Sequence, residues 1–322
     1  MKNRVTEILG IERPILQGPM SWITNAEFVA AVSNAGGLGI LGPNAGQTTV
    51  TVSPEKTAER MRREIRKTKG LTDKPFGTTL LVGGDLTYTW PILEIVIEEG
   101  VQVVLLNGVE GSLNEKIINP LKEAGIKIVY RPLDPTIEDA KAAQAMGVDV
   151  YVVTGFDEGG TLPSSIIGTF TITPMLVDVL DIPVIAAGGI GDARGVASAF
   201  ELGAEGVFLG SRFIPTVENP AALSVKQKIV DSSAADLLLY RTLPAYYRSL
   251  PTPFAEKLVA MDKQGASREE IAKFANGASA IRIGMLEGNG EAGIITVGTG
   301  ITPIKKIQTV QEVVDELATG IK

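Results

Sequence analysis

The ten residues from Thr154 to Pro163, TGFDEGGTLP, place two adjacent carboxylates before two adjacent glycines. The apolar run VDVYVV comes just before them, so Asp157 and Glu158 are expected in a loop at the end of a buried strand. A carboxyl group in apolar surroundings can have its pKa raised toward neutrality, and it can then act as a general acid or base. The commoner role of loop carboxylates is structural, with one capping a turn or pairing with a cation. Both roles remain open at this point.

Two further loops offer backbone rather than side-chain chemistry. Gly188 and Gly189 follow the apolar run IPVIAA, and Gly210 and Ser211 follow GVFL. Glycine lets a phosphate approach closely, and bare N–H groups together with the N-terminus of a following helix supply hydrogen-bond donors. A single Gly-Gly pair is more often only a tight turn, but two such loops after the last two strands of a barrel favour a phosphate site.

Other candidate side chains also stand near the ends of apolar runs. In QGPMSW, a Gly-Pro turn with Met20 and Trp22 suits a planar ring, although core packing is the commoner fate of such residues. Arg131 ends another run, and when buried it needs an anion. That anion is supplied by residues 154–163, called the acidic loop below, by a substrate carboxylate or by a cofactor phosphate. Tyr246 and Tyr247 in PAYYRSLP either donate a proton or pack. From spacing alone, a flavin is favoured only slightly over a sugar phosphate.

The composition excludes several classes of site. The 322 residues include no histidine and no cysteine, which rules out disulfides, thiolate zinc sites and cysteine nucleophiles, so no metal site is expected. A net charge of −7 argues against nucleic acid or an anionic membrane as partner and leaves a small-molecule substrate. No apolar stretch approaches a membrane span, and MKNRVTEILG lacks a signal-peptide core, so the cytoplasm is the expected compartment. A homodimer is compatible with this composition, but no segment indicates its interface.

A recurring sequence pattern indicates the strands and helices that position these residues. Helix-compatible segments end in glycine or are followed by proline, and a β-branched run begins directly afterwards, at Pro14, Gly36, Pro75, Gly100, Gly125, Gly147, Pro183 and Gly203. These eight apolar runs alternate with helical patterns such as NAEFVAAVSNA and TIEDAKAAQAM. They predict an α/β fold, a parallel (β/α)₈ TIM barrel, with an open doubly wound sheet as the alternative. The candidate residues would then meet at the carboxyl ends of the strands, where such barrels carry their active sites.

The rhythm changes after LGSRF. Residues 214–290 contain no βα unit, but they contain the helical patterns AALSVKQKIVD, TPFAEKLVAMDKQ and SREEIAKFAN. We expect a helical insertion or cap over residues 214–290, and a barrel formed by residues 1–213 and 291–322. The closing segment begins with the glycine-rich stretch GIITVGTGITPIKK and continues as an amphipathic helix.

Four of these motifs, QGPMSW, SNAGGLGIL, IPVIAAGGIGD and LGSRF, together resemble one family. It is the FMN-dependent family of nitronate monooxygenases (formerly 2-nitropropane dioxygenases) and enoyl-acyl carrier protein reductase II. The family pattern runs roughly QGGMAW, AGGLG, FGVN, EAGGH, AAGGI and GTRF, and the resemblance covers nearly the whole chain. It implies an FMN-binding TIM barrel that acts as an oxidoreductase, with NADH or NADPH as electron donor in the reductase branch.

The resemblance also implies cofactor contacts, carried over by position. FMN would lie against the first, sixth, seventh and eighth loops, through Gly18, Pro19, Met20, Gly159, Gly188, Gly189, Gly210 and Ser211. Two other cofactor positions hold different polar residues, because Thr79 replaces the asparagine of FGVN and Thr154 replaces a family Gln or Glu. Ser211 replaces a threonine, which is a mild change.

The most consequential departure is Thr161, which replaces the histidine of EAGGH. In the family that histidine lies beside the flavin and serves as base or proton donor, whereas a threonine hydroxyl has no pKa near neutrality. The catalytic candidates are therefore Glu158 and Asp157, with Thr161 as the substituted position. The substrate candidates are Trp22, Arg131 and Tyr246.

Several functions follow from this combination. The first is an FMN-dependent oxidoreductase resembling nitronate monooxygenase, in which the flavin carries the redox step. The second is an NAD(P)H-dependent enoyl or quinone reductase of the same family, in which water or another side chain delivers the proton. The third is a catalytically impaired flavin-binding protein. Outside the family, a flavin-free barrel would act on a sugar phosphate through Asp157 or Glu158.

Overall fold

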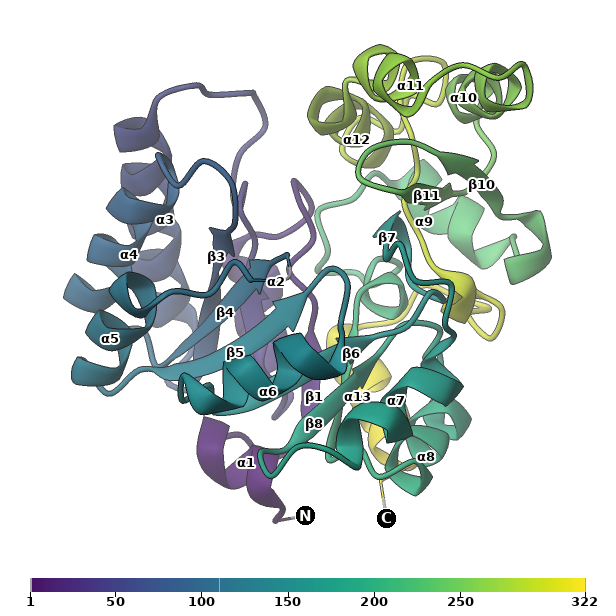
Figure 1. Cartoon of the computed structure of the whole chain (residues 1–322). Helices are drawn as coiled ribbons and strands as arrows, with labels where there is room; N and C mark the ends of the chain where they lie inside the picture. The colour runs from purple at the N-terminus through teal and green to yellow at the C-terminus, as the bar shows by residue number, and fades with distance from the viewer. Residues whose placement is uncertain (1, 110, 322) are drawn as a thin grey trace.

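The computed structural model describes residues 2–109 and 111–321, and an eight-stranded parallel sheet rolled into a barrel lies at its centre (Figure 1). Its strands are β1 (Ile15–Gln17), β2 (Gly39–Leu41), β3 (Phe76–Val82), β4 (Val103–Gly108), β5 (Lys127–Pro132), β6 (Val150–Thr154), β8 (Val184–Ala187) and β9 (Gly206–Leu209). The hydrogen-bonded order is β1-β9-β8-β6-β5-β4-β3-β2, and a parallel bridge from Leu16 to Leu38 joins the two edges. The predicted TIM barrel is confirmed. Each of its strands begins one to three residues after the glycine or proline that predicted it.

The strands are buried on both faces, which explains their continuous apolar sequences. Side chains that point into the barrel form one cluster, in which Leu16, Ile40, Leu105 and Val129 are fully buried. The opposite faces of the same strands pack beneath the surrounding helices. Parallel strands covered in this way need no polar alternation, so their runs are apolar throughout.

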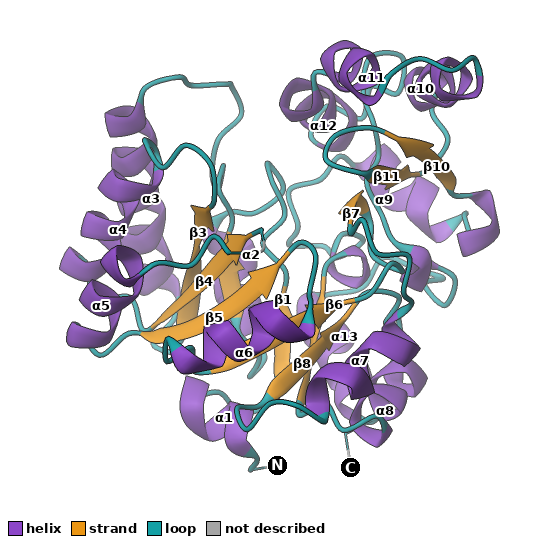
Figure 2. Ribbon diagram, viewed as in Figure 1, coloured by secondary structure: helices purple, strands orange, loops and turns teal. Residues whose placement is uncertain are grey.

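The helices form the outer layer (Figure 2). They are α2 (Ala26–Asn34), α3 (Pro54–Leu71), α4 (Thr89–Glu98), α5 (Glu115–Glu123), α6 (Ile137–Ala145), α7 (Thr169–Val177), α8 (Ala193–Glu201) and α13 (Val310–Ala318). The last of these packs between α8 and α2 and so closes the ring. An additional helix, α1 (Arg4–Leu9), covers the amino-terminal end of the barrel with Val5 and Leu9.

The segment 214–290 contains the expected helices α9 (Leu223–Val230), α10 (Pro253–Lys263) and α11 (Arg268–Ala275), and also α12 (Gly277–Met285). It also contains two strands that the sequence patterns did not predict, β10 (Leu238–Arg241) and β11 (Tyr246–Ser249). Strand β11 pairs antiparallel with β10 and with β7 (Gly160–Leu162), which is part of the acidic loop. Figure 2 shows this small sheet beside the open end of the barrel.

Within the described residues, the structure holds no helix with both the length and the apolar character that a membrane crossing requires.

Candidate functional site

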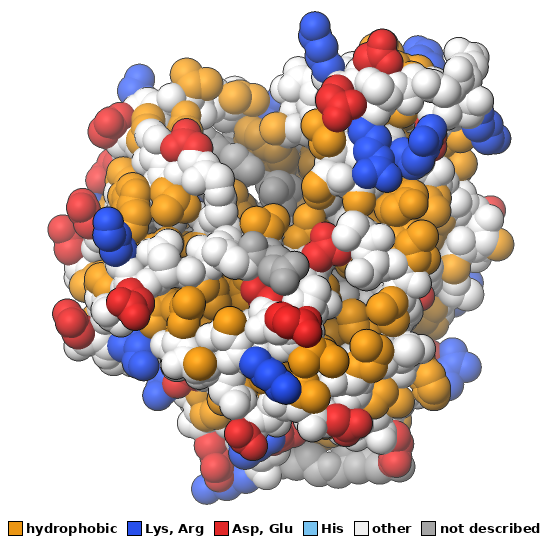
Figure 3. Space-filling view, viewed as in Figure 1, with side chains coloured by type: hydrophobic (Ala, Val, Ile, Leu, Met, Phe, Trp, Pro, Cys, Tyr) orange, Lys and Arg blue, Asp and Glu red, His pale blue; other side chains and the backbone are white. Residues whose placement is uncertain are grey.

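The carboxyl ends of the strands and the segment 214–290 enclose a cavity of about 620 Å³. Figure 3 shows the molecule hollowed between the α3 side and the α10–α12 side. The structure brings eleven of the predicted residues to this cavity, namely Gly18, Pro19, Met20, Arg131, Glu158, Gly159, Thr161, Gly188, Gly189, Gly210 and Ser211. The predicted loops therefore meet at one place.

One side of the cavity is built from glycine backbone. Gly188 and Gly189 adopt the left-handed φ values of 97° and 73°, which favour glycine. Gly298, from the closing segment, donates its N–H to the Ser211 Oγ over 2.8 Å. Among the described residues, no partner is found for the N–H groups of Gly189 and Ser211. This side is therefore a concave surface with free donors, as an anion site requires.

The N-terminus of α8 does not contribute donors in the expected way. Its N-cap residue, Asp192, accepts hydrogen bonds from the N–H groups of Arg194 over 3.0 Å and Gly195 over 3.1 Å. The same carboxylate pairs with the Arg194 guanidinium. Because these first-turn groups are already satisfied, the loop amides rather than the helix end remain for a phosphate.

The loops near the mouth of the barrel require glycine for close approach. A Cβ at Gly18 would lie 2.8 Å from the Phe208 ring, and one at Gly159 would lie 2.2 Å from the carbonyl carbon of Val297. Met20 lines the cavity beside them. Trp22, in contrast, is 3% exposed and does not line the cavity, so its role in this structure is packing.

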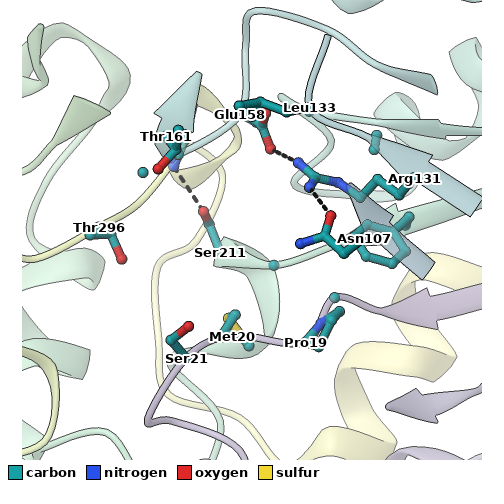
Figure 4. A pocket seen from close by; sticks show the side chains of 18 of the residues that line it. Pro19, Met20, Ser21, Asn107, Arg131, Leu133, Glu158, Thr161, Ser211 and Thr296 are labelled. Carbon is teal, nitrogen blue, oxygen red and sulfur yellow. Dashed lines mark hydrogen bonds and ion pairs between the residues drawn. The ribbon is translucent and has the colours of Figure 1, made fainter. Parts of the chain in front are cut away.

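The other side of the cavity carries charged side chains from two loops (Figure 4). Arg131, at the end of β5, donates to the Asn107 Oδ1 over 2.9 Å and to the Glu158 Oε2. Its guanidinium carbon lies 5.9 Å from the centre of the Phe208 ring. The Arg131 Nε and the Glu158 Oε1 are buried without a partner, so the pair retains one donor and one acceptor.

Burial dominates the protonation of Glu158. The side chain is 13% exposed, and this desolvation raises its pKa to about 7, although the charges of Arg131 and Arg248 act in the opposite direction. Asp134 raises the same pKa slightly further. A carboxyl group with this pKa is divided between its protonated and ionised forms at neutral pH, which suits a general acid or base.

The neighbouring carboxylate has a structural position. The Asp157 Oδ2 accepts the N–H of Thr169 over 2.7 Å, at the first turn of α7, and the side chain does not line the cavity. Its carbonyl accepts the N–H and the hydroxyl of Thr299. The two carboxylates of the acidic loop therefore have different structural roles. Asp157 caps α7, and Glu158 pairs with Arg131.

Three other predicted residues lie outside the cavity lining. Strand β3 continues to Val82, so Thr79 sits in mid-strand with its side chain directed into the barrel, and Thr154 faces inward on β6. The hydroxyls of both threonines are buried without a partner. Tyr246 packs its ring edge-on against Phe156 at 5.6 Å.

Thr161 lines the cavity from β7, opposite Tyr247 in the strand register. Tyr247 also lines the cavity, and burial raises the pKa of its hydroxyl well above the usual value. Sequence reasoning named Tyr247 only beside Tyr246, and it missed Gly298 and Gly300 of the closing segment. The Gly-Thr-Gly in that segment was the available signal, because it repeats the glycine pattern of the phosphate loops.

The described residues contain no cluster of three or more acidic side chains, the metal-ligand types left without His and Cys, that could hold a metal ion.

Comparisons with known proteins agree with this geometry. The nitronate monooxygenase family model matches residues 2–320. A (3aS,4S,5R,7aS)-5-hydroxy-7a-methyl-1-oxo-octahydro-1H-indene-4-carboxyl-CoA dehydrogenase from Rhodococcus jostii (strain RHA1) is 29% identical, covering 100% of this chain and 96% of that protein. A probable nitronate monooxygenase from Staphylococcus haemolyticus (strain JCSC1435) is 34% identical over 74% of both chains.

Solved structures add the fold. FabK from Thermotoga maritima superposes with a TM-score of 0.87 at 32% identity, covering 99% of this chain and 96% of that chain. Nitroalkane oxidase from Streptomyces ansochromogenes, at 23% identity and a TM-score of 0.80 over 99% of this chain and 98% of that chain, shares the fold. The chain therefore belongs to the nitronate monooxygenase family, a family of flavin-dependent oxidoreductases.

Proposed function

We propose that the cavity binds FMN, with the phosphate against Gly189, Gly210 and Ser211 and the flavin ring toward Gly18 and Glu158. The volume of about 620 Å³ lies within the range of small-molecule sites. Free amides and the absence of side chains at the glycines fit a phosphate. Among the described cavity-lining residues, Glu158 is the only carboxylate, so little negative charge opposes a phosphate.

The observation that carries the proposed reaction is the Arg131–Glu158 pair. When bound, FMN supplies the hydride or electron chemistry that the side chains lack. Glu158, with a pKa of about 7, holds or releases a proton at its Oε1, which is the role that the family histidine, replaced here by Thr161, would otherwise serve. Arg131 orients this carboxyl group through the Oε2, and Asn107 in turn orients Arg131.

The first candidate reaction is reduction of an enoyl or quinone acceptor with NADH or NADPH as electron donor. A partly protonated carboxyl group can deliver the proton that such a reduction requires. The Rhodococcus relative, which matches along 96% of its length and is named as a carboxyl-CoA dehydrogenase, supports an acyl thioester as the substrate class.

The second candidate is oxidation of a nitronate. It is favoured by Arg131, which lines the cavity, because a guanidinium suits the oxygens of an anionic substrate. The probable nitronate monooxygenase of Staphylococcus haemolyticus supports it as well.

The visible spectrum of the purified protein tests the FMN cofactor that both candidate reactions need. We expect a yellow protein, or one that becomes yellow with added FMN, and a protein that stays colourless would refute the cofactor. Anaerobic mixing with NADH and NADPH follows. Bleaching by either supports the reductase, whereas oxidation of propane-2-nitronate without bleaching supports the second candidate. A yellow protein inert in every assay would be a flavin-binding protein without turnover.

A further inference from the structure

Arg248 is a buried cation that the proposed chemistry does not use. It lies on β11 and is 8% exposed. Its Nη1 donates to the carbonyl oxygens of Phe156 over 2.5 Å and of Glu158 over 2.6 Å. The guanidinium carbon also lies 5.2 Å from the centre of the Phe156 ring. A side chain from segment 214–290 is thus hydrogen-bonded to the backbone on both sides of Asp157.

The backbone makes the same connection. On β11, Arg248 lies opposite Gly160 and Tyr247 lies opposite Thr161, so the second half of the acidic loop forms the edge of the small sheet. The first half follows β6 of the barrel. The loop that carries Glu158 is therefore fixed by the barrel at one end and by β11 at the other.

Burial of the charged Arg248 guanidinium costs free energy unless an opposite charge compensates it. No carboxylate lies within ion-pair distance of it among the described residues, and burial lowers its pKa while Asp157 and Glu158 act to raise it. A buried guanidinium neutralised only by carbonyl dipoles keeps a strong field at nearby acids. Glu158 lies in that field.

We propose that Arg248 is a positioning residue for Glu158, which holds the acidic loop in place through two carbonyl groups and stabilises the ionised carboxylate through its charge. The inference rests on the proposed role of Glu158 in proton transfer. The charged and titratable groups near Glu158 are Arg131 from β5, Asp134 after β5, Tyr247 and Arg248 from β11, and Asp157 beside it. Arg248 is the member of this group that links its backbone to segment 214–290.

The test compares three variants of the full chain, with and without added FMN. Arg248→Gln removes the charge. Arg268→Gln is the control, because Arg268, on α11, lies over the ring of Tyr246 and, within the described residues, forms no hydrogen bond or ion pair with the acidic loop. Glu158→Gln identifies the signal of the carboxyl group. The readouts are the pH midpoint of the carboxylic-acid infrared band that Glu158→Gln deletes, and hydrogen–deuterium exchange across residues 156–162.

We expect Arg248→Gln to raise the midpoint by roughly one pH unit and to speed exchange, while Arg268→Gln changes neither. A wild-type midpoint with wild-type exchange in Arg248→Gln overturns the inference. If Glu158→Gln deletes no titrating band, the proposed role of Glu158 fails instead, whatever Arg248 does.

A second variant keeps the inference testable if Arg248→Gln does not fold. Arg248→Lys keeps the charge but replaces the planar guanidinium by a compact ammonium. We expect its midpoint to stay near the wild-type value while exchange at residues 156–159 rises. Two results for Arg248→Lys would contradict the proposal that the charge sets the midpoint and the two hydrogen bonds hold the loop. One is a midpoint shifted as far as in a neutral replacement, and the other is unchanged hydrogen exchange.

Discussion

The two sides of the cavity are built from different parts of the polypeptide. The glycine side, with Gly189, Gly210 and Gly298, offers amide groups that do not titrate. The charged side, with Arg131 and Glu158, offers groups whose chemistry changes with pH. The first should fail when a negative charge is added, and the second should fail when charge is removed. Variants on the two sides therefore separate cofactor binding from proton transfer.

The largest effect is expected from Gly210→Asp on the glycine side. A Cβ at Gly210 meets nothing closer than the Met20 Sδ at 3.8 Å, and the residue does not need a left-handed φ, so the fold should persist. The new carboxylate would oppose the FMN phosphate, and we expect binding to weaken by roughly 100-fold or more. Quenching of FMN fluorescence on titration with protein measures the affinity.

Gly210→Ala is the control for this variant, and it should retain FMN within a few-fold. Gly189 is a poorer choice, because its φ of 73° and a Cβ only 2.9 Å from that of Asp157 would strain any substitution. Wild-type affinity in Gly210→Asp would move the phosphate away from this loop.

The next largest effect is expected from Glu158→Gln on the charged side. Glutamine keeps an oxygen for the Arg131 hydrogen bond but cannot exchange a proton. We expect FMN affinity to be kept and turnover to fall by about 10²-fold, the lower end of what a general acid or base contributes, with loss of the pH dependence near neutrality. Steady-state rates from pH 5 to pH 9 check this, and an unchanged profile would assign proton transfer elsewhere.

The same substitution has a defined effect on stability. The folded protein raises the pKa of Glu158 from 4.5 to about 7, so it binds this proton more tightly than the unfolded chain does. The associated stability is fully present below about pH 4.5 and is lost as pH rises through about 7, by at most about 3 kcal/mol. Denaturation at about pH 5 and about pH 8 should show this decline in wild type and a smaller one in Glu158→Gln.

A smaller and different effect is expected from Asp157→Ala. This carboxylate accepts the Thr169 N–H at the first turn of α7, so its loss should cost about 1 kcal/mol of folding free energy. Turnover of the remaining folded protein should change little, since Asp157 does not line the cavity. Chemical denaturation and rates measured on the same preparations give the comparison. A fall in turnover like that of Glu158→Gln, with unchanged stability, would reverse the two roles.

The contrast between local and distant interactions also explains what the sequence could predict. The barrel strands follow from apolar runs that begin after glycine or proline, and the glycine loops follow from the same runs, because both signals lie within a few residues. The pairing of β7 with β11 joins short segments that lie far apart in the sequence, and neither is long enough to show a strand period. The buried position of Arg248 depends on that pairing, so no local pattern indicates it.

Thr79 and Thr154 show a second limit. The family pattern placed both near the flavin, yet the register directs them into the barrel and outside the cavity lining. Position along a strand is decided by where pairing ends, and β3 continues three residues beyond Thr79. Contact of the two hydroxyls with FMN stays a prediction, which the strand register alone does not test.

The smallest effect is expected at the two adjacent tyrosines of β11, of which the sequence analysis chose Tyr246 as a substrate candidate whereas Tyr247 lines the cavity. Tyr246 packs against Phe156 beneath Arg268, so Tyr246→Phe keeps its contacts and should change turnover less than about two-fold. Tyr247 lines the cavity opposite Thr161, so Tyr247→Phe removes a hydroxyl at the site and should raise KM or lower kcat several-fold. Rates with NADPH and a quinone measure both variants. A larger effect from Tyr246→Phe would mean that strand β11 presents its other face to the substrate, and the assignment of Arg248 to the acidic loop would then have to change with it.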